Sequence, residues 1–385
     1  MLNAGKRVAI LVGAGAAQAV PEVLQAAEVL GAGIAKALLG KPTIPDTLPF
    51  VTGGIGLLGT RPSYEMMRDC DTLLMIGSGF PYAEFLPEEG AARGVQVDIY
   101  PAMLSLRYPM EVNLEGDSAY TLRELLPLLQ PKSERKWRDT IEKNVAAWWD
   151  TLGRRAMQKA DPVNPQQVFW ELSPRLPDDV MLACDTGSTV HWYSRELRMR
   201  EGMQAAHSGN LASMGAAMPY AIAAKFAHPD RPVMAFVGDG AMQMNGINEL
   251  ITVARYRRQW RDQRFVVIVI NNRDLNMVSW EQRVLEGDPK FPASQDLPGF
   301  SYARFAELVG FGSFTIDAPD KVVPVLEAAL ALDAPVLIEV IADPNVPPLP
   351  PHVSARQAGK YIAALAKGDP DALKVVRASV KELFA

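Results

Sequence analysis

The chain has 385 residues, enough for two domains that each bury their own core. Its hydrophobic content of 48% and charged content of 22% are typical of a globular protein. The net charge of −5, without a long basic stripe, gives no indication of nucleic-acid binding, and we expect none. Cys70 and Cys184 form no CxxC pattern, which argues against a disulfide framework or zinc site and favours a reducing, cytoplasmic location.

Residues 1–130 read as alternating strands and helices. Apolar runs at 7–12, 72–76 and 95–99 predict strands, and residues 21–39 predict a helix. Residues 40–62 are rich in glycine and proline and predict a loop. Strands that alternate with helices favour an α/β fold with a doubly wound parallel sheet.

A glycine turn, Gly13-Ala14-Gly15, follows the first predicted strand. It invites comparison with the dinucleotide fingerprint, but Gln18 stands where the third glycine is expected. We therefore interpret it as a tight strand-to-helix turn. Asp98, near the end of another strand, suits a ribose hydroxyl equally as well as the alternative of a solvated carboxylate.

Residues 131–164 predict a charged linker helix between two domains, and residues 165–342 predict a second doubly wound α/β domain. Within it, residues 211–225 predict a small-residue helix. Residues 280–300 predict a long irregular segment suited to a lid or binding loop. The linker carries tryptophans that we expect to pack on a domain surface, namely Trp137, Trp148 and Trp149.

The stretch of greatest chemical interest is residues 237–278. A strand ends in Gly238-Asp239-Gly240, a helix follows, and the next strand ends in Asn271-Asn272. Because the carboxyl ends of parallel strands meet at one edge, Asp239 and Asn272 should lie side by side. Their oxygens suit Mg²⁺, and the glycine turn at a helix N-terminus suits a diphosphate.

Residues 343–385 form a proline-rich exit and a basic helical tail. Leu373, Val376, Val380 and Leu383 recur at helical spacing. Such a helix can lie on an anionic membrane, or it can pack on the protein body or on a partner subunit. The residues leave these alternatives open.

The GDG and NN motifs resemble the signature of the thiamine diphosphate (ThDP) enzymes. Asp239 and Asn272 are 33 positions apart, several more than in the family's usual pattern, and we place the surplus near the loop that contains Trp260. The resemblance extends over essentially the whole chain and is closest to the pyruvate oxidase and pyruvate:quinone dehydrogenase branch, within the acetohydroxyacid synthase-like superfamily. It implies a homo-oligomer with peripheral membrane contact through the tail, at the inner face of the membrane.

The resemblance implies two cofactor sites and a metal site. Residues 1–130 resemble the family's central, FAD-carrying domain. The FAD residues it implies are Thr52, Gly53, Gly54, Ile55, Ser78, Gly79, Phe80, Pro81, Tyr82 and Asp98. The ThDP residues it implies are Asp185, Gly187, Ser188, Thr189, Ala212, Ser213, Met214, Gly238, Asp239, Gly240, Ala241, Asn272, Leu275, Asn276 and Met277. The implied Mg²⁺ ligands are the side chains of Asp239 and Asn272 and the backbone carbonyl of Asp274.

One part of the family pattern is missing. Family members begin with a pyrimidine-binding domain whose glutamate activates the cofactor, and no residue here matches that glutamate. We expect either an N-terminally truncated piece, which we favour, or one half of an enzyme whose pyrimidine-binding domain is a separate chain. The catalytic residues therefore stay unknown.

The resemblance predicts ThDP- and Mg²⁺-dependent decarboxylation of a 2-oxo acid, most simply pyruvate, with electrons passing to FAD and then to a quinone or oxygen. An alternative is acetohydroxyacid synthase-type carboligation, in which FAD takes no redox part. A further alternative is a fragment or cofactor-binding subunit that has no turnover without a separate pyrimidine-binding domain.

Overall fold

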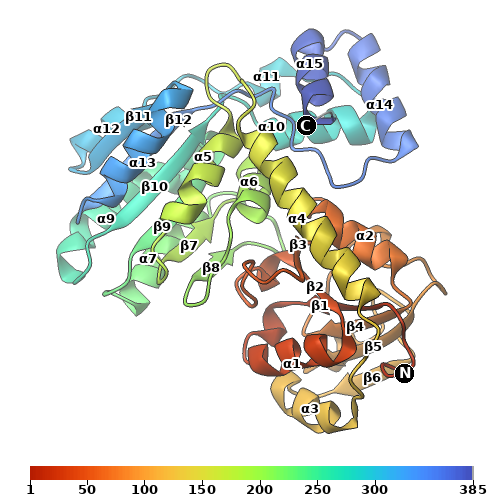
Figure 1. Cartoon of the computed structure of the whole chain (residues 1–385). Coiled ribbons are helices and arrows are strands. Elements are labelled where there is room, and N and C mark those ends of the chain that lie inside the picture. Colours follow the sequence, from red (N-terminus) through yellow and green to blue (C-terminus); the bar gives the residue numbers. More distant parts are fainter. Residues whose placement is uncertain (384–385) are drawn as a thin grey trace. The chain divides into compact units, whose positions relative to one another are not determined.

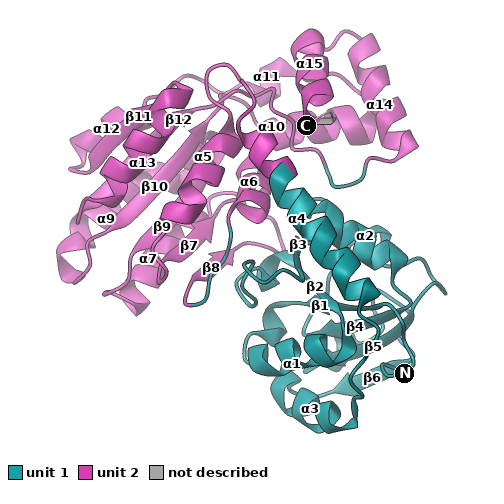
Figure 2. Ribbon diagram, in the orientation of Figure 1, with its two compact units in different colours: residues 1–150, 198–201, 350–352 teal, residues 151–197, 202–349, 353–385 magenta. Residues whose placement is uncertain are grey.

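The computed structural model describes residues 1–383, except the side chain of Leu383. The chain divides into two compact units (Figure 2). Unit 1 comprises Met1–Asp150, Arg198–Glu201 and Pro350–His352. Unit 2 comprises Thr151–Leu197, Gly202–Leu349 and the described residues from Val353 onward.

Unit 1 is built on a parallel sheet of six strands in the order β3-β2-β1-β4-β5-β6 (Figure 1). The strands are β1 Val8–Val12, β2 Gly33–Lys36, β3 Val51–Gly54, β4 Thr72–Ile76, β5 Arg93–Asp98 and β6 Val112–Glu115. The helices are α1 Val20–Leu30, α2 Arg61–Asp69, α3 Ser118–Leu125 and α4 Lys136–Ala156, which ends in unit 2.

Strand β1 shows why this sheet has helices on both faces. Val8, Ile10 and Val12 belong to a core with residues of α1 and α3, whereas Ala9 and Leu11 belong to a core with residues of α2 and α4. All five residues are buried. A strand that is buried on both faces needs a continuous apolar run, which is what the sequence shows.

Unit 2 is built on a second parallel sheet of six strands, in the order β11-β12-β10-β9-β7-β8. Its strands are β7 Met181–Cys184, β8 Gln204–His207, β9 Val233–Gly238, β10 Phe265–Asn271, β11 Gly312–Ile316 and β12 Pro335–Ile341. Its helices are α5 Pro165–Leu172, α6 Ser188–Glu196, α7 Ala217–Ala227, α8 Asp239–Ala241, α9 Ile247–Tyr256, α10 Asn276–Glu281, α11 Pro292–Gln295, α12 Tyr302–Leu308 and α13 Val322–Leu330.

Helices cover both faces of the unit 2 sheet as well. Residues of α7, α9 and α12 share one core with Val267 and Val269 of the central strand β10. On the other face, Phe169 of α5 packs against Phe236 of β9, with ring centroids 5.1 Å apart. The two doubly wound sheets confirm the α/β fold predicted from the sequence.

Some local predictions are wrong. The helix expected over residues 21–39 ends at Leu30, because Gly31 adopts the left-handed conformation (φ 57°) that terminates helices. Strands β2 and β3 occupy residues 33–36 and 51–54, the latter within the expected loop. These strands have four residues each and contain glycine, so pairing with neighbouring strands, not local pattern, sets their conformation.

Two predictions in the second domain also need correction. The helix expected from residue 211 begins at Ala217, because Ala212 and Gly215 have positive φ angles of 49° and 83° and cannot continue a right-handed helix. The segment 280–300 is partly helical: α10 runs on through a π-helical turn, Gln282–Glu286, and α11 follows.

The tail forms two helices, α14 Ala355–Ala366 and α15 Ala372–Leu383. Leu373 is 90% exposed, and Val376 and Val380 are also exposed, while the predicted fourth apolar position, the side chain of Leu383, lies outside the described residues. Lys360 and Lys367 donate hydrogen bonds to backbone carbonyls of unit 2. Among residues 1–383, no helix has both the length and the apolar character that crossing a membrane requires. The membrane contact of the tail stays a prediction.

Candidate functional site

The candidate site lies where β7, β9 and β10 end. The chain passes from β7 to β8 on one side and then to β9 on the other, so the strand order reverses at β7. In open parallel sheets, ligands bind at the carboxyl ends of strands at such a reversal. Asp185 follows β7, Asp239 follows β9, and Asn272 follows β10. Gly238 is paired with Ile270 in the sheet, so Asp239 and Asn272 leave neighbouring strands at nearly the same level.

Asp239 is a buried carboxylate, 3% exposed, whose hydrogen bonds come from backbone N–H groups. It accepts hydrogen bonds from the N–H groups of Gly240 at 2.9 Å and Arg273 at 2.5 Å. Within residues 1–383 it has no ion pair, and burial raises the pKa of Asp239 to about 7. The helix that begins at Asp239 continues through a π-helical turn to Tyr256, which adds the positive end of a long helix to the site.

The turn after β10 is strained. Arg273 adopts a left-handed backbone conformation (φ 55°), which is rare for a residue with a side chain. The Asn272 oxygen accepts a hydrogen bond from the Asp274 N–H at 3.1 Å and so closes the turn. The side chain of Asn271 donates to buried Glu339 at 2.7 Å. The first asparagine therefore ties β10 to β12, and the second shapes the turn that faces Asp239.

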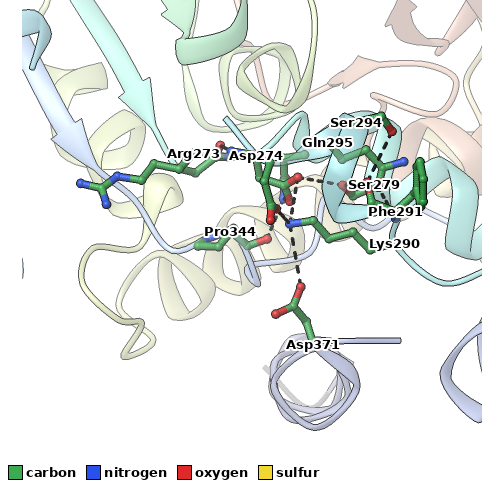
Figure 3. Close-up of polar contacts among 12 residues, drawn as sticks. Arg273, Asp274, Ser279, Lys290, Phe291, Ser294, Gln295, Pro344 and Asp371 are labelled. Atoms are coloured by element: carbon green, nitrogen blue, oxygen red, sulfur yellow. Dashed lines mark hydrogen bonds and ion pairs between the residues drawn. The ribbon is translucent and has the colours of Figure 1, made fainter. Parts of the chain in front are cut away.

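The Asp274 carboxylate is held by three side chains of the protein (Figure 3). It accepts hydrogen bonds from Ser279 Oγ at 2.8 Å and Asn276 Nδ2 at 3.3 Å, and it pairs with Lys290 Nζ at 3.2 Å. Asn276, predicted to lie near the diphosphate, also donates to the Pro344 carbonyl at 2.6 Å. These contacts are compatible with the predicted ligand from Asp274 being its backbone carbonyl.

Asp185 holds the segment that carries three other predicted residues, Ala212, Ser213 and Met214. The carboxylate is 1% exposed and accepts hydrogen bonds from the N–H groups of Thr186 at 2.9 Å, Gly215 at 2.8 Å and Ala217 at 3.0 Å. Burial raises the pKa of Asp185. In addition, the Thr186 hydroxyl donates to the Ser213 carbonyl at 3.2 Å. Asp185 thus anchors the 212–217 turn to the end of β7.

Gly240 is the point where predicted residues from separate segments meet. A Cβ at this position would lie 2.7 Å from Leu275 Cδ2 and 3.2 Å from Met214 Cε. At Gly187 (φ 107°), by contrast, no heavy atom of the described residues, apart from Gly187 and its two chain neighbours, lies within 4 Å of a Cβ position. Ser188 and Thr189 are buried in the first turn of α6, and Ala241 belongs to the core. The site therefore combines a packed glycine under Met214 with an open one at the start of α6.

This donor set fits a magnesium diphosphate. Within residues 1–383, no group of three or more His, Cys, Asp or Glu side chains is arranged to hold a metal ion. The site offers a buried carboxylate that has no cationic partner in the described part of the chain, an amide oxygen and a helix N-terminus. These groups suit a hard cation that brings further oxygens from a phosphate ligand. The ligand roles of Asp239, Asn272 and Asp274 stay predictions.

Several of the predicted FAD residues in unit 1 form hydrogen bonds within the protein or are buried in its core. Thr52 Oγ1 donates to the Ile34 carbonyl at 3.1 Å, and Ser78 Oγ accepts from the Phe80 N–H at 3.3 Å. Phe80 and Ile55 are buried in one core cluster. The remaining positions are Gly53 and Gly54 at the end of β3, Gly79, Pro81 and Tyr82 in the loop after β4, and Asp98 at the end of β5. An FAD site would therefore depend on backbone groups and Asp98, and it stays a prediction.

The sequence reasoning missed three residues that shape the site: Lys290, Tyr302 and Glu339. The buried Tyr302 hydroxyl donates to the Asp239 carbonyl at 3.2 Å. Glu339 accepts from Asn271 and from the Ala303 N–H at 3.1 Å. A charged residue inside the apolar strand β12 is a signal that could have marked Glu339. No local sequence pattern points to Lys290 or Tyr302.

Comparison with known proteins matches both units. Residues 1–125 match the family model "Thiamine pyrophosphate enzyme, central domain", and residues 185–340 match "Thiamine pyrophosphate enzyme, C-terminal TPP binding domain". The 385-residue chain is 32% identical over 387 aligned residues to the "Putative thiamine pyrophosphate-containing protein YdaP" of Bacillus subtilis, an alignment that covers 100% of the chain and 65% of that relative.

Two other relatives carry the names of enzymes. The chain is 27% identical to a "Probable acetolactate synthase large subunit" of Methanococcus aeolicus, with 90% of the chain and 59% of the relative covered. It is 28% identical to the "Sulfoacetaldehyde acetyltransferase" of Castellaniella defragrans, with 81% and 55% covered. The chain thus spans about three fifths of the length of the curated relatives it matches.

Proposed function

This chain carries the central domain and the C-terminal ThDP-binding domain of the thiamine pyrophosphate enzymes, and we propose that it holds ThDP through Mg²⁺ at the ends of β7, β9 and β10. The observation that carries the proposal is Asp239, a buried carboxylate that forms no ion pair with any described residue. It lies at a helix N-terminus and beside the strained Asn272–Asp274 turn. A bound divalent cation would place a counter-charge beside this carboxylate.

The surrounding residues have separate tasks in this proposal. Asp239 and Asn272 present oxygens to the cation, and the first turns of α6 and α8 present N–H groups to the diphosphate. Met214, held by the turn that Asp185 anchors, lies over Gly240 and supports the cofactor's organic part. Bound ThDP supplies the electron sink for decarboxylation of a 2-oxo acid and for transfer of the resulting two-carbon unit.

For the complete enzyme, we propose carboligation of the acetolactate synthase type, with pyruvate as the simplest 2-oxo acid. The names of the relatives support this reaction, which the sequence predicted as an alternative, over the pyruvate oxidase reaction that it placed first. Carboligation requires no electron acceptor, so it does not depend on the FAD residues of unit 1.

Cofactor binding is tested by titrating Mg²⁺ and ThDP into the chain and following its tryptophan fluorescence or the heat of binding. Asp239→Ala should abolish Mg²⁺-dependent binding. Asp230→Ala, which removes a carboxylate 59% exposed on the same unit, should leave it unchanged. Equal binding by Asp239→Ala and the unmodified chain would refute the site.

The reaction is tested by adding pyruvate to the chain alone and together with a pyrimidine-binding domain. Acetolactate without change in a flavin spectrum supports carboligation, whereas bleaching of a bound flavin by pyruvate supports the oxidase reaction instead. A preparation that is colourless and does not bind added FAD removes the redox reaction. Turnover by the chain alone would exclude a purely cofactor-binding subunit.

A further inference from the structure

A buried ion-pair cluster connects the tail to the body of unit 2. Arg283, in the π-helical turn after α10, forms two hydrogen bonds to Asp369, which lies between α14 and α15; they measure 2.8 and 3.0 Å. The two side chains are 2% and 0% exposed. Charge-assisted, two-point pairs of this kind are strong and fix geometry as well as distance. The α14–α15 hairpin is therefore docked in one position at this junction.

Lys290 extends the cluster to the predicted metal site (Figure 3). Its backbone N–H donates to Asp369 at 2.8 Å. Its side chain is 8% exposed, and Nζ lies 3.2 Å from Asp274, 2.7 Å from Asp296 and 4.0 Å from Asp371. One residue thus contacts both the tail and the turn that follows the two asparagines.

Lys290 is needed to balance the negative charge of the carboxylates around it. Within the described residues, the ion pairs of this cluster join four carboxylates to two cations, Lys290 and Arg283; the carboxylates are those of Asp274, Asp296, Asp369 and Asp371. Asp274 is 5% exposed, and its only ion pair within residues 1–383 is the one with Lys290. Without Lys290, a buried carboxylate loses its counter-charge, and such a group moves toward water or another cation.

The hairpin is held at its other end as well. Glu382 near the end of α15 pairs with Arg155 at 2.8 Å and accepts a hydrogen bond from Gln166. Both partners belong to unit 2 and are far from the Arg283 junction in sequence. Because the hairpin is fixed at two places, it can resist displacement of Lys290 and, through it, of the Asp274 turn.

We propose that Lys290 is a positioning residue for the metal-binding turn, and that Arg283 and Asp369 act through it, so that docking of the α14–α15 hairpin sets the affinity for Mg²⁺–ThDP. This inference rests on the proposed function, because it takes the Asn272–Asp274 turn as part of the cofactor site. Outer partners that orient metal ligands change metal affinity roughly ten- to hundredfold when they are removed.

The test compares two lysines that both join the tail to this region. Lys290→Met should weaken Mg²⁺–ThDP binding roughly ten- to hundredfold. Lys367→Met removes the same charge from a pair with Asp288 in which both side chains are 54% exposed, and should leave affinity unchanged. Lys290→Arg, which keeps the charge, should restore part of the affinity. Equal affinities of Lys290→Met and Lys367→Met would overturn the inference.

A double-mutant cycle separates positioning from general loosening. If Asp369 acts through Lys290, the combined Lys290→Met and Asp369→Asn variant should lose less affinity than the product of the two single losses. If the loss of affinity in the double variant equals the product of the two single losses, the residues act independently, which contradicts the inference.

Hydrogen exchange of the ligand-free protein gives a readout that does not need the cofactor. Lys290→Met should speed exchange in peptides covering residues 272–279, and Lys367→Met should not. If the unmodified chain binds no ThDP, the proposed function fails, while the exchange result still decides whether the hairpin holds the turn. If ThDP binds normally but neither affinity nor exchange responds to Lys290→Met, only the positioning role fails.

Discussion

Both sheets have six parallel strands, yet the space around the glycines at their carboxyl edges differs. In unit 1, a Cβ on Gly13, directly after β1, would lie 2.3 Å from the Gly77 carbonyl oxygen, and Gly15 and Gly77 also touch through their backbones. In unit 2, a Cβ on Gly238, at the end of β9, would have its nearest neighbour at 3.5 Å, the Thr189 hydroxyl. The first edge is therefore closed by backbone at Gly13, whereas the second has space beside Gly238.

The two edges also differ in whether a buried charged side chain has an oppositely charged partner. Lys36, at the end of β2, is buried and pairs with Asp46 at 2.5 Å, and it donates to the carbonyls of Lys41 at 2.9 Å and Ile44 at 2.7 Å. Asp239 in unit 2 has no such cation within residues 1–383. A buried carboxylate with an internal cation is explained by the fold, whereas one held only by backbone N–H groups at the carboxyl edge of a sheet is a candidate for binding an added cation.

Breaking the internal ion pair of unit 1 should have the largest effect on stability. Asp46→Ala removes contacts to Lys36, Lys41 and the Met199 N–H, and should lower the free energy of unfolding by about 3–5 kcal/mol. Asp69→Ala, which removes an exposed pair with Arg68, should cost under about 1 kcal/mol. Urea unfolding of both variants measures the difference, and similar costs would show that Asp46 is not the centre of this cluster.

The glycine contrast can be tested with a matched pair of substitutions. Gly13→Ala forces a methyl group into the Gly77–Ser78 backbone and should destabilise unit 1 by about 1–3 kcal/mol. Gly238→Ala, at a negative φ of −76° and with space for the methyl group, should change stability by less than about 1 kcal/mol. Thermal unfolding distinguishes them, and an equal loss would contradict the difference between the edges.

Rising pH should affect the two units in opposite directions. Burial lowers the pKa of Lys36 to about 8, although Asp46 opposes the shift. Burial raises the pKa of Glu196 to about 8, where Arg195 opposes and Glu382 reinforces the shift. Between pH 8 and 10.5 the unfolded chain binds more protons at Lys36 than the folded one, so unit 1 gains stability. Between pH 4.5 and 8 the folded chain binds more protons at Glu196, so unit 2 loses stability.

Each of these groups contributes a slope of at most about 1.4 kcal/mol per pH unit, the value for one proton. Unfolding measured across both pH ranges should show the two slopes. Lys36→Met should remove the contribution of Lys36 to the alkaline gain, and Glu196→Gln should reduce the loss below pH 8, to which Asp239, with its pKa raised to about 7, also contributes. Slopes that persist in these variants would assign the titration to other groups.

The smallest expected effect on stability is at the candidate site itself. Asp239→Asn removes a buried charge that has no ion pair among residues 1–383, but it also replaces one of the two oxygens that accept the Gly240 and Arg273 N–H groups with an NH₂. Because this gain and this loss oppose each other, stability without cofactor should change by less than about 1 kcal/mol. Binding of Mg²⁺–ThDP should nevertheless be lost. A large loss of stability without ligand would instead give Asp239 a structural role like that of Asp46.

The sequence by itself determined the fold class and the placement of the two central residues of the candidate site. Strands such as β4, β9 and β10 are buried on both faces, so each reads as an apolar run that local pattern detects. The motif residues directly follow these strands, and parallel pairing then brings Asp239 and Asn272 together without further information. These features depend only on neighbours along the chain or on the regularity of the sheet.

Only the tertiary structure decided how the site is held. Asp185 is predicted to lie near the diphosphate, and the structure adds that its N–H partners Gly215 and Ala217 make it the anchor of a turn. Lys290 meets Asp369 across 79 positions of sequence, a distance at which no local period applies. The four-residue strands β2, β3 and β8 likewise take their form from pairing. Long-range contacts of single polar side chains leave no pattern in the sequence, because the partner's position depends on the whole fold.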